Sequence, residues 1–322
     1  MADVDTLVRV VDPAFRADVL AGLAAPIPAI PARWFYDHRG SQLFEEITRL
    51  PEYYPTRTET ALLEHKSGEI AAMVGGGEAV IEFGSGSSAK TPILLRAMRP
   101  GAYVPVDISG DFLRESAAGL QREFPDLPIY PVEADFTRSF ALPPEVQGAA
   151  KLGFFPGSTI GNFVARSAVD LLRAMKETLG EGAKLVIGMD RIKDVDVLIR
   201  AYDDPAGVTA AFNLNLLHRI NAELDADIPV EAFRHKAIWN DALSRIEMHL
   251  AAVRDVAFAV CGRRFAFKAG ETIHTENSHK YGHRDSRILL RAAGWGVAAE
   301  WTDEQEWFSI LLAEAEPARF AP

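Results

Sequence analysis

The stretch Ala79-Val-Ile-Glu-Phe-Gly-Ser-Gly-Ser-Ser88 decides the fold of this 322-residue chain. Its first five residues form a short apolar run, which predicts a buried β-strand over residues 79–83. Gly84 and Gly86 follow at once, and residues 89–96 then predict a helix. Glycines at such a turn let the backbone approach a ligand closely, because no Cβ lies in the way. The stretch therefore predicts a strand, a ligand-binding turn and a helix.

Short apolar strands continue to alternate with helices after this turn. Strands are expected at 103–107, 129–133, 151–155 and 184–189, with helices at 111–120 and 169–175. This alternation predicts an α/β fold whose parallel, doubly wound sheet is covered by helices on both faces. The core is thus expected to be Rossmann-like, with its ligand at the carboxyl ends of the strands.

The flanking regions predict a second, α+β lobe. Its expected elements are a helix pair at 5–24, helices at 196–226, and antiparallel strands at 233–238, 244–253 and 256–268. A helix at 286–293 and a final strand at 307–313 end the chain. The predicted division is an N-terminal arm of the second lobe (1–57), a core (58–194), an inserted substrate-binding lobe (195–280) and a C-terminal completion of the core (281–322).

Composition limits the classes of partner. The net charge is −11 and no basic cluster stands out, which argues against a nucleic-acid partner. One cysteine, Cys261, permits no intramolecular disulfide. The first residues lack the basic and apolar regions of a signal peptide, and no apolar run reaches the roughly 18 residues of a membrane helix. We expect a cytoplasmic protein with no membrane partner, and a monomer.

Acidic residues at the strand ends indicate which ligand the turn binds. Asp107 ends the second strand, where a carboxylate suits a ribose diol. Asp135 and Phe136 follow the third strand and suit an adenine amine and ring. Glu82, just before the glycines, resembles the acidic-x-Gly-x-Gly motif of class I methyltransferases and favours S-adenosylmethionine (SAM). Ala89 is tolerated in a dinucleotide fingerprint, so NAD stays open on this pattern alone.

Longer motifs make the resemblance more specific. They are Trp34-Phe-Tyr-Asp37, Leu50-Pro-Glu-Tyr-Tyr-Pro-Thr-Arg-Thr-Glu59, Gly157-Ser-Thr-Ile-Gly-Asn162, Ala201-Tyr-Asp-Asp-Pro-Ala-Gly-Val-Thr-Ala-Ala-Phe-Asn213, Arg245-Ile-Glu-Met248 and Glu276-Asn-Ser-His-Lys280. From about residue 30 onward the chain closely resembles the histidine-specific Nα-methyltransferases of ergothioneine biosynthesis, which convert L-histidine to hercynine. The resemblance implies trimethylation of the α-amino group of free histidine, with SAM as the methyl donor.

The resemblance also assigns roles to residues that match the motifs. It implies SAM binding by Tyr53, Gly84, Lys90, Asp107, Asp135 and Phe136. Asn162 would receive the α-amino group, and Tyr36 and Tyr202 the carboxylate. The imidazole would be held by Glu276 and Ser278, in a pocket shaped by Phe44, Thr159 and Met248.

The chemistry agrees with these roles. An attacking amine must be deprotonated, and an asparagine oxygen can accept its hydrogen bond while orienting it. Glu276 can accept an imidazole N–H, whereas an apolar substrate would leave its carboxylate buried and unpaired. Tyr36 and a water molecule are both candidates for taking the proton. Aromatic faces such as Tyr36 and Phe44 suit the cationic product.

Three other readings remain open on the sequence. A member of the same family could act on tryptophan or a histidine derivative. A binding protein could sense SAM or histidine without catalysis, and an oxidoreductase could use NAD. The histidines at 38, 218, 235, 249, 274 and 283 show no spacing typical of metal ligands, so no metal site is expected.

Overall fold

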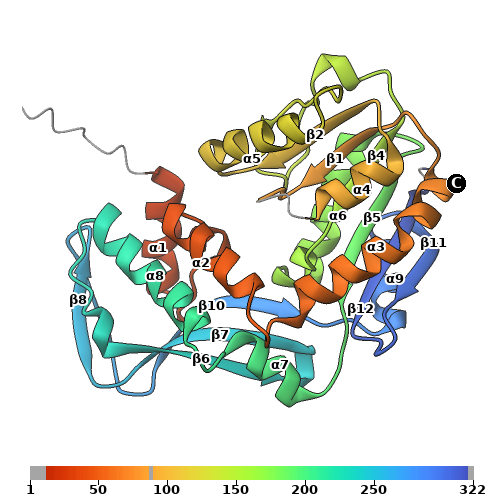
Figure 1. Cartoon of the computed structure of the whole chain (residues 1–322). Coiled ribbons are helices and arrows are strands. Elements are labelled where there is room, and N and C mark those ends of the chain that lie inside the picture. Colours follow the sequence, from red (N-terminus) through yellow and green to blue (C-terminus); the bar gives the residue numbers. More distant parts are fainter. Residues whose placement is uncertain (1–11, 87–89, 318–322) are drawn as a thin grey trace, which may run out of the picture. The chain divides into compact units, whose positions relative to one another are not determined.

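A computed structural model describes residues 12–86 and 90–317 (Figure 1). The chain divides into two compact units, each built from separated stretches of sequence. Unit 1 comprises residues 1–47, 199–239 and 247–276, and unit 2 comprises residues 48–198, 240–246 and 277–322. The expected helix pair at 5–24 is represented by α1 (Pro13–Leu23), and its first residues, 5–11, lie outside the described ranges.

Unit 2 contains a seven-stranded sheet in the order β11-β12-β5-β4-β1-β2-β3. Its parallel strands are β1 (Ala79–Phe83), β2 (Ala102–Asp107), β3 (Val132–Glu133), β4 (Lys151–Phe155) and β5 (Lys184–Asp190). The remaining two are β11 (Trp295–Thr302) and β12 (Phe308–Ala315), which pair antiparallel with each other. The predicted α/β fold with a largely parallel sheet is confirmed.

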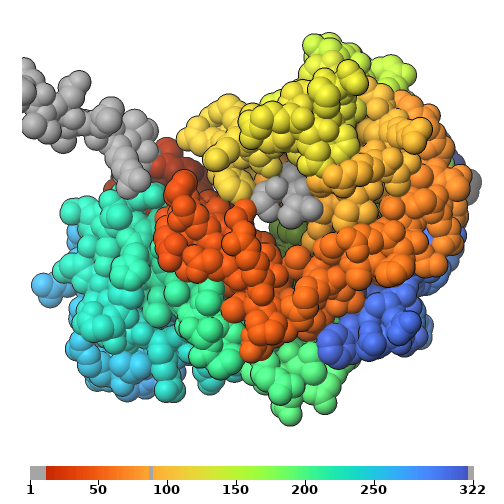
Figure 2. Space-filling view, in the orientation of Figure 1, coloured from red at the N-terminus to blue at the C-terminus, as the bar shows by residue number. Residues whose placement is uncertain are grey.

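Helices cover both faces of the sheet. Successive side chains of a strand point to opposite faces, so neighbouring residues of one strand pack against different helices. In β1, Ile81 and Phe83 pack with α6 (Ala165–Leu179) and α9 (His283–Ala292), whereas Val80 packs with α3 (Tyr54–Val74) and α4 (Thr91–Met98). The outer faces of α3 and α4 lie at the surface (orange in Figure 2). The strands are therefore apolar on both faces over most of their length, and Glu82 in β1 and Asp190 in β5 are buried charged exceptions. Helix α5 (Gly110–Glu123) follows β2.

Three features of this sheet differ from the expectations. The third strand is shorter, since only Val132 and Glu133 pair with β2 beyond a single bridge at Ile129. The final strand, β12, is antiparallel to β5 rather than part of a wholly parallel sheet. The sequence reading did not include β11, whose burial alternates weakly because it lies at the sheet edge. Only the turn between β11 and β12 is short, so no crossover helix of the kind that marks parallel strands in a sequence separates these two strands.

Unit 1 is built around helices and small sheets. Its helices are α1, α2 (His38–Thr48), the end of α7 (Val195–Tyr202) and α8 (Val208–Glu223). The strands β10 (Thr272–His279), β7 (Arg245–Ala252) and β6 (Phe233–Asn240) form one sheet in that order, and their residues 240, 245–246 and 277–279 are assigned to unit 2. Strand β8 (Val256–Val260) pairs antiparallel with β9 (Arg263–Phe267). The predicted turn at Cys261-Gly262 is confirmed, with positive φ at both residues. Strand β10 was not predicted.

Short 3₁₀ helices connect several of these elements. They lie at Ala32–Phe35, Pro144–Val146, Thr159–Asn162, Val230–Ala232 and Asp241–Leu243. Within the described part of the chain, no helix is both long and apolar enough to cross a membrane.

Candidate active site

The glycine turn after β1 is held against the end of β2. Gly84 N donates to Val106 O at 2.8 Å, and Gly86 N donates to Asp107 Oδ2 at 3.1 Å. Gly84 and Gly86 have φ values of 69° and 48°, in the left-handed region that favours glycine. The other carboxylate oxygen, Asp107 Oδ1, accepts from Ser109 N at 2.9 Å. Asp107 thus lies beside the turn, where the spacing of the sequence predicted it.

Phe136 closes the other side of this turn. A Cβ added to Gly84 would lie 3.3 Å from Phe136 Cε1, so a side chain there would press on the ring. The ring also packs edge-on against Phe155, with centroids 5.9 Å apart. Asp135, next to Phe136, accepts from the amide and the hydroxyl of Thr137 at 3.0 and 2.6 Å. The structure therefore brings Gly84, Asp107 and Phe136 together.

Glu82 has a buried structural position at this end of β1. Its side chain is 2% exposed, and its Oε2 accepts from the hydroxyls of Thr91 and Tyr103, each at 2.6 Å. Burial raises the pKa of Glu82 to about 7, although these two hydrogen bonds oppose the rise. The acidic residue of the motif therefore joins β1 to β2 and to the start of α4, which fixes the turn between them.

Lys90 meets a partner that sequence reasoning missed. Its ammonium group forms an ion pair with Glu59, a side chain of α3 that is 1% exposed. Both carboxylate oxygens of Glu59 also accept from Gly157 N, at 3.0 and 2.9 Å. Glu59 therefore ties the residue before α4 to the loop after β4. Tyr53, the remaining predicted SAM ligand, is buried at the N-cap of α3 and its carbonyl accepts from Arg57 at 3.2 Å.

A second group of predicted residues lies on the loop after β4 and the end of β10. Thr159 and Asn162 belong to one 3₁₀ turn, and Thr159 Oγ1 donates to Pro156 O at 3.1 Å. The carbonyl of Gly161 is 2.8 Å from His279 Nδ1, and a Cβ on Gly161 would approach His279 O to 2.9 Å. The structure thus holds the segment carrying Asn162 against the segment carrying Ser278.

Tyr36 and Phe44, predicted to contact the substrate, belong to one aromatic cluster in unit 1. Their ring centroids are 5.7 Å apart with an interplanar angle of 77°. Phe212 contacts both rings, at 5.9 Å from Tyr36 and 6.0 Å from Phe44. Phe212 lies in one of the motifs quoted above but received no role there.

Tyr202 and Met248 are linked through a buried amide. Asn213 is 0% exposed, and its Nδ2 lies 2.8 Å from His235 Nδ1. An amide N–H donated to Nδ1 leaves the proton of His235 on Nε2, which lies 2.7 Å from Tyr202 O. Thr275 Oγ1 lies within hydrogen-bond distance of Asn213 Oδ1 (2.8 Å) and Met248 O (3.0 Å). Burial lowers the pKa of His235, which keeps the ring neutral and this chain intact.

Glu276 and Ser278 stand two residues apart on β10. Side chains at that spacing share one face of a regular strand. The carbonyl of Glu276 lies 2.9 Å from His274 Nε2, and Ser278 is 4% exposed.

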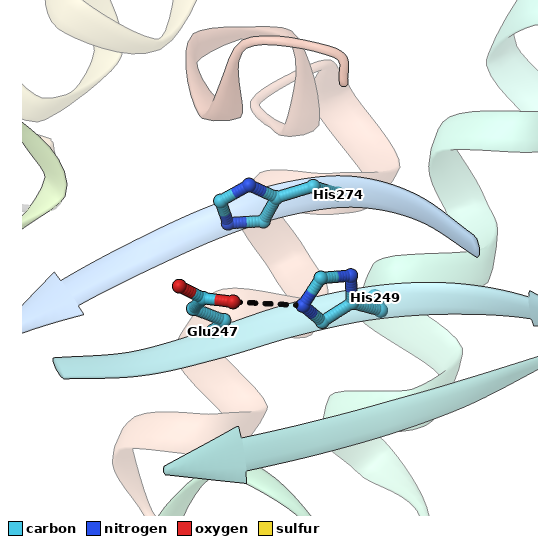
Figure 3. Close-up of side chains that lie close together, drawn as sticks. All are labelled: Glu247, His249 and His274. Carbon is cyan, nitrogen blue, oxygen red and sulfur yellow. Dashed lines mark hydrogen bonds and ion pairs between the residues drawn. The ribbon is translucent and has the colours of Figure 1, made fainter. Parts of the chain in front are cut away.

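Glu247, His249 and His274 form a cluster that the sequence spacing did not predict (Figure 3). Their candidate ligand atoms lie within 4.8 Å of one another, and His249 Nε2 is 3.2 Å from Glu247 Oε2. The two imidazole rings are stacked, with centroids 4.8 Å apart and planes 20° apart. We therefore interpret the cluster as a stacked pair supported by Glu247.

The residues around the glycine turn fit SAM. Its ribose needs hydroxyl acceptors, and a carboxylate such as Asp107 can accept about four hydrogen bonds, of which the turn and Ser109 use two. The adenine needs an apolar flat surface, which Phe136 offers next to Gly84. A side chain on Gly84 would fill this space, which explains the glycine. SAM supplies a methyl group on a positively charged sulfur.

Comparison with known proteins identifies the family. Among solved structures, an S-adenosylmethionine-dependent methyltransferase from Clostridium acetobutylicum aligns with 87% of this chain and 97% of that chain, at 11% identity and a TM-score of 0.45. Histidine N-alpha-methyltransferases of Mycolicibacterium smegmatis and Mycobacterium tuberculosis are each 42% identical over 306 residues, 93% of this chain and 94% of each relative. The model of the SAM-dependent, histidine-specific methyltransferases matches residues 15–315. The chain therefore belongs to that family of SAM-dependent methyltransferases.

Proposed function

We propose that this enzyme transfers three methyl groups from SAM to the α-amino group of free L-histidine and so forms hercynine. The observation that carries the proposal is the arrangement at the carboxyl ends of β1 and β4, two adjacent strands of unit 2. The glycine turn that fits SAM follows β1, and the loop with Asn162 follows β4. The His279–Gly161 hydrogen bond keeps the β10 segment beside that loop.

Positioning is the main contribution that the protein can make to this reaction. Methyl transfer is an in-line displacement, so holding the amine in the right direction lowers the barrier. In the proposal, Asn162 Oδ1 accepts a hydrogen bond from the deprotonated amine, which keeps its lone pair directed at the methyl group. Glu59 supports this step indirectly, because it holds Gly157 in the loop that carries Asn162.

The remaining substrate groups are assigned by the same proposal. Tyr36 and Tyr202 bind the carboxylate, while Phe44, Thr159 and Met248 shape the pocket. Glu276 accepts an N–H of the imidazole, and Ser278 bonds the other ring nitrogen. The Tyr36–Phe44–Phe212 cluster supports a role in binding the trimethylated cation, because aromatic faces attract cations without requiring a hydrogen bond.

The proton released from the amine goes either to Tyr36 or to a water molecule. A Tyr36→Phe variant separates the two. If Tyr36 takes the proton, the variant loses most of its kcat and the acidic limb of the pH–rate profile shifts. An unchanged profile assigns the proton to water.

We further propose that the enzyme acts as a cytoplasmic monomer whose product enters ergothioneine synthesis. The net charge of −11 and the single cysteine support the first part. The second part is supported by ergothioneine biosynthesis protein 1 of Neurospora crassa, which is 30% identical over 89% of this chain and 33% of that protein. Light scattering in solution tests the monomer.

The deciding experiment is mass spectrometry of the purified enzyme with SAM and an equimolar mixture of the twenty amino acids. We expect histidine alone to gain three methyl groups. Methylation of tryptophan or another amino acid would overturn the assignments of Glu276 and Ser278 while keeping the chemistry. SAM binding without methylation of any of the twenty would favour a modified substrate or a sensor.

A further inference from the structure

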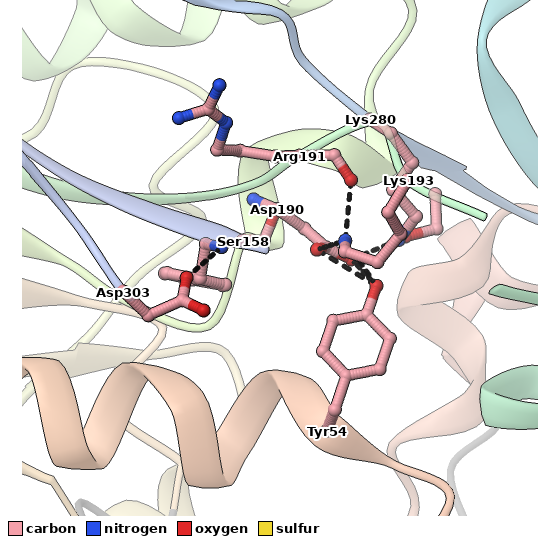
Figure 4. A network of polar contacts seen from close by, with 9 residues as sticks. Tyr54, Ser158, Asp190, Arg191, Lys193, Lys280 and Asp303 are labelled. Atoms are coloured by element: carbon pink, nitrogen blue, oxygen red, sulfur yellow. Dashed lines mark hydrogen bonds and ion pairs between the residues drawn. The ribbon is translucent and has the colours of Figure 1, made fainter. Parts of the chain in front are cut away.

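Unit 2 contains a buried charged cluster next to Ser278, made of Tyr54, Asp190, Lys193 and Lys280 (Figure 4). Lys280 Nζ lies 2.6 Å from Asp190 Oδ2, and Lys193 Nζ lies 2.5 Å from Asp190 Oδ1. Tyr54 donates its hydroxyl to Asp190 at 2.7 Å. The side chains of Asp190, Lys193 and Lys280 are only 1%, 3% and 0% exposed. Such complete burial of charge is costly, so these groups need a specific reason to be present.

The cluster holds two ammonium groups and one carboxylate. Burial raises the pKa of Asp190, but the two lysines outweigh it and the pKa lies below its usual value, so Asp190 is ionised. Burial lowers the pKa of Lys193 to about 8. Lys193 donates to Asp190 and to Tyr54 OH within the cluster, and to the backbone carbonyl of Arg191 beside it. Lys280, in contrast, also has a side-chain hydrogen bond to a residue outside the cluster.

The residue outside the cluster that Lys280 contacts is Ser278. Lys280 Nζ donates to Ser278 Oγ at 2.8 Å. Its bond to the carboxylate of Asp190 holds the ammonium group in place. An ammonium group has three hydrogens and no lone pair, so Ser278 is the acceptor in this bond. The serine hydroxyl hydrogen cannot be given to Lys280 and must be directed at a different acceptor.

We propose that Lys280 is a positioning residue that makes Ser278 a hydrogen-bond donor to the unprotonated ring nitrogen of the substrate. The inference rests on the proposed function, in which Ser278 contacts the imidazole. A serine on its own can donate or accept and would bond either form of the ring. The Lys280 ammonium occupies one of the two lone pairs of Ser278 Oγ, and its positive charge disfavours a second N–H donor there. Ser278 therefore favours donation to a neutral imidazole, which has one N–H and one lone pair. Glu276 accepts the N–H, and Ser278 donates to the lone pair.

This arrangement lets the enzyme discriminate against substrates whose ring lacks a second nitrogen. A ring that has carbon in that place would leave the serine hydroxyl without its acceptor, in a buried site where an unmade hydrogen bond is costly. The two pyrrolylalanines, pyrrol-2-yl and pyrrol-3-yl, each keep one ring N–H and lack the second nitrogen. The discrimination ratio is kcat/KM for histidine divided by kcat/KM for the better of these two analogues.

The experiment measures this ratio in the full-length enzyme and its variants with SAM. We expect a ratio of roughly 100 or more in the parent enzyme. Ser278→Ala should lower it most, and Lys280→Met should lower it about tenfold. Lys280→Met added to Ser278→Ala should change it no further, because Lys280 acts through Ser278. The matched control is Lys193→Met, which also removes an ion pair to Asp190 but has no bond to Ser278, and it should keep the parent ratio.

The outcomes separate the two proposals. If Ser278→Ala leaves the ratio unchanged, Ser278 does not bond the ring nitrogen, and that part of the proposed function fails together with the inference. If Ser278→Ala lowers the ratio but Lys280→Met does not, only the inference is overturned. An equal loss in Lys193→Met would mean general damage to the cluster and also overturns it. Should Lys280→Met fail to fold, Lys280→Gln replaces it, because its amide oxygen can accept from Ser278, and a parent-like ratio would contradict the proposal.

Discussion

Replacing Glu59 by alanine removes the buried carboxylate that joins α3, Lys90 and the loop after β4. The side chain is 1% exposed and accepts the amide hydrogen of Gly157 as well as the ammonium of Lys90. The variant leaves two donors without this partner. Gly188→Ala should disturb the same carboxylate, because a Cβ on Gly188 would overlap Glu59 Oε1.

The magnitude follows from what each donor can do afterwards. Removing one partner of a buried ion pair costs about 3–5 kcal/mol. Lys90 is 13% exposed and can regain part of its hydration, which favours the lower end of that range. Glu59→Gln keeps an oxygen for Gly157 and should cost about 1.5–3 kcal/mol. We therefore expect about 3 kcal/mol for Glu59→Ala and less for Glu59→Gln.

Urea denaturation followed by circular dichroism measures these free energies of unfolding. Glu64→Ala is the matched control, since Glu64 lies on the same helix but is exposed, and it should stay within about 0.5 kcal/mol of the parent. Calorimetry should also show weaker SAM binding in Glu59→Ala, because Lys90 loses the group that orients it. A loss below about 1 kcal/mol in Glu59→Ala would refute the reasoning, because no buried pair would then have been broken.

Three further predictions concern other contacts. Burial raises the pKa of Glu82 from 4.5 to about 7, so its contribution to stability is fully present below pH 4.5 and is lost as the pH rises through 7. Between pH 4.5 and pH 7 the unfolding free energy of the parent should fall by about 3 kcal/mol more than that of Glu82→Gln. An equal dependence of unfolding free energy on pH in the two proteins would contradict this. Asn213→Ala should lower the unfolding free energy by about 1–3 kcal/mol because the acceptors His235 Nδ1 and His249 O lose their donor, whereas a change below about 0.5 kcal/mol would show that the amide is dispensable. Gly84→Ala, with φ at 69° and a Cβ 3.3 Å from the ring of Phe136, should weaken SAM binding roughly tenfold in calorimetry, and an unchanged affinity would show that the turn can relax.

Local patterns in the sequence predicted the core well. The apolar run at 79–83 is β1, the glycines after it form the turn, and Asp107 reaches that turn through Gly86. Each of these features depends on residues near one another in the sequence or on a fixed strand–turn–helix spacing. Such signals survive without knowledge of the tertiary structure.

The contacts that connect distant segments could not be predicted in this way. Glu59 meets Gly157, and Lys280 meets Asp190, across long separations in the sequence. Both charged residues lie within motifs that the sequence analysis quoted, yet periodicity says nothing about a partner so far away. A charged side chain inside an otherwise apolar or aromatic motif was the available signal. The same reasoning explains why His249 and His274, which come from neighbouring strands, were treated as isolated histidines.

The position of β12 between β5 and β11 has a consequence for how the chain is made. Strand β5 ends at Asp190, but its neighbour β12 begins only at Phe308. At ordinary elongation rates the ribosome needs roughly 6–23 s to produce the intervening residues. During that time one edge of β5 exposes unpaired backbone groups and apolar side chains, which is a template for aggregation. Faster synthesis of the C-terminal residues shortens this exposure, and pairing of β12 with β5 ends it.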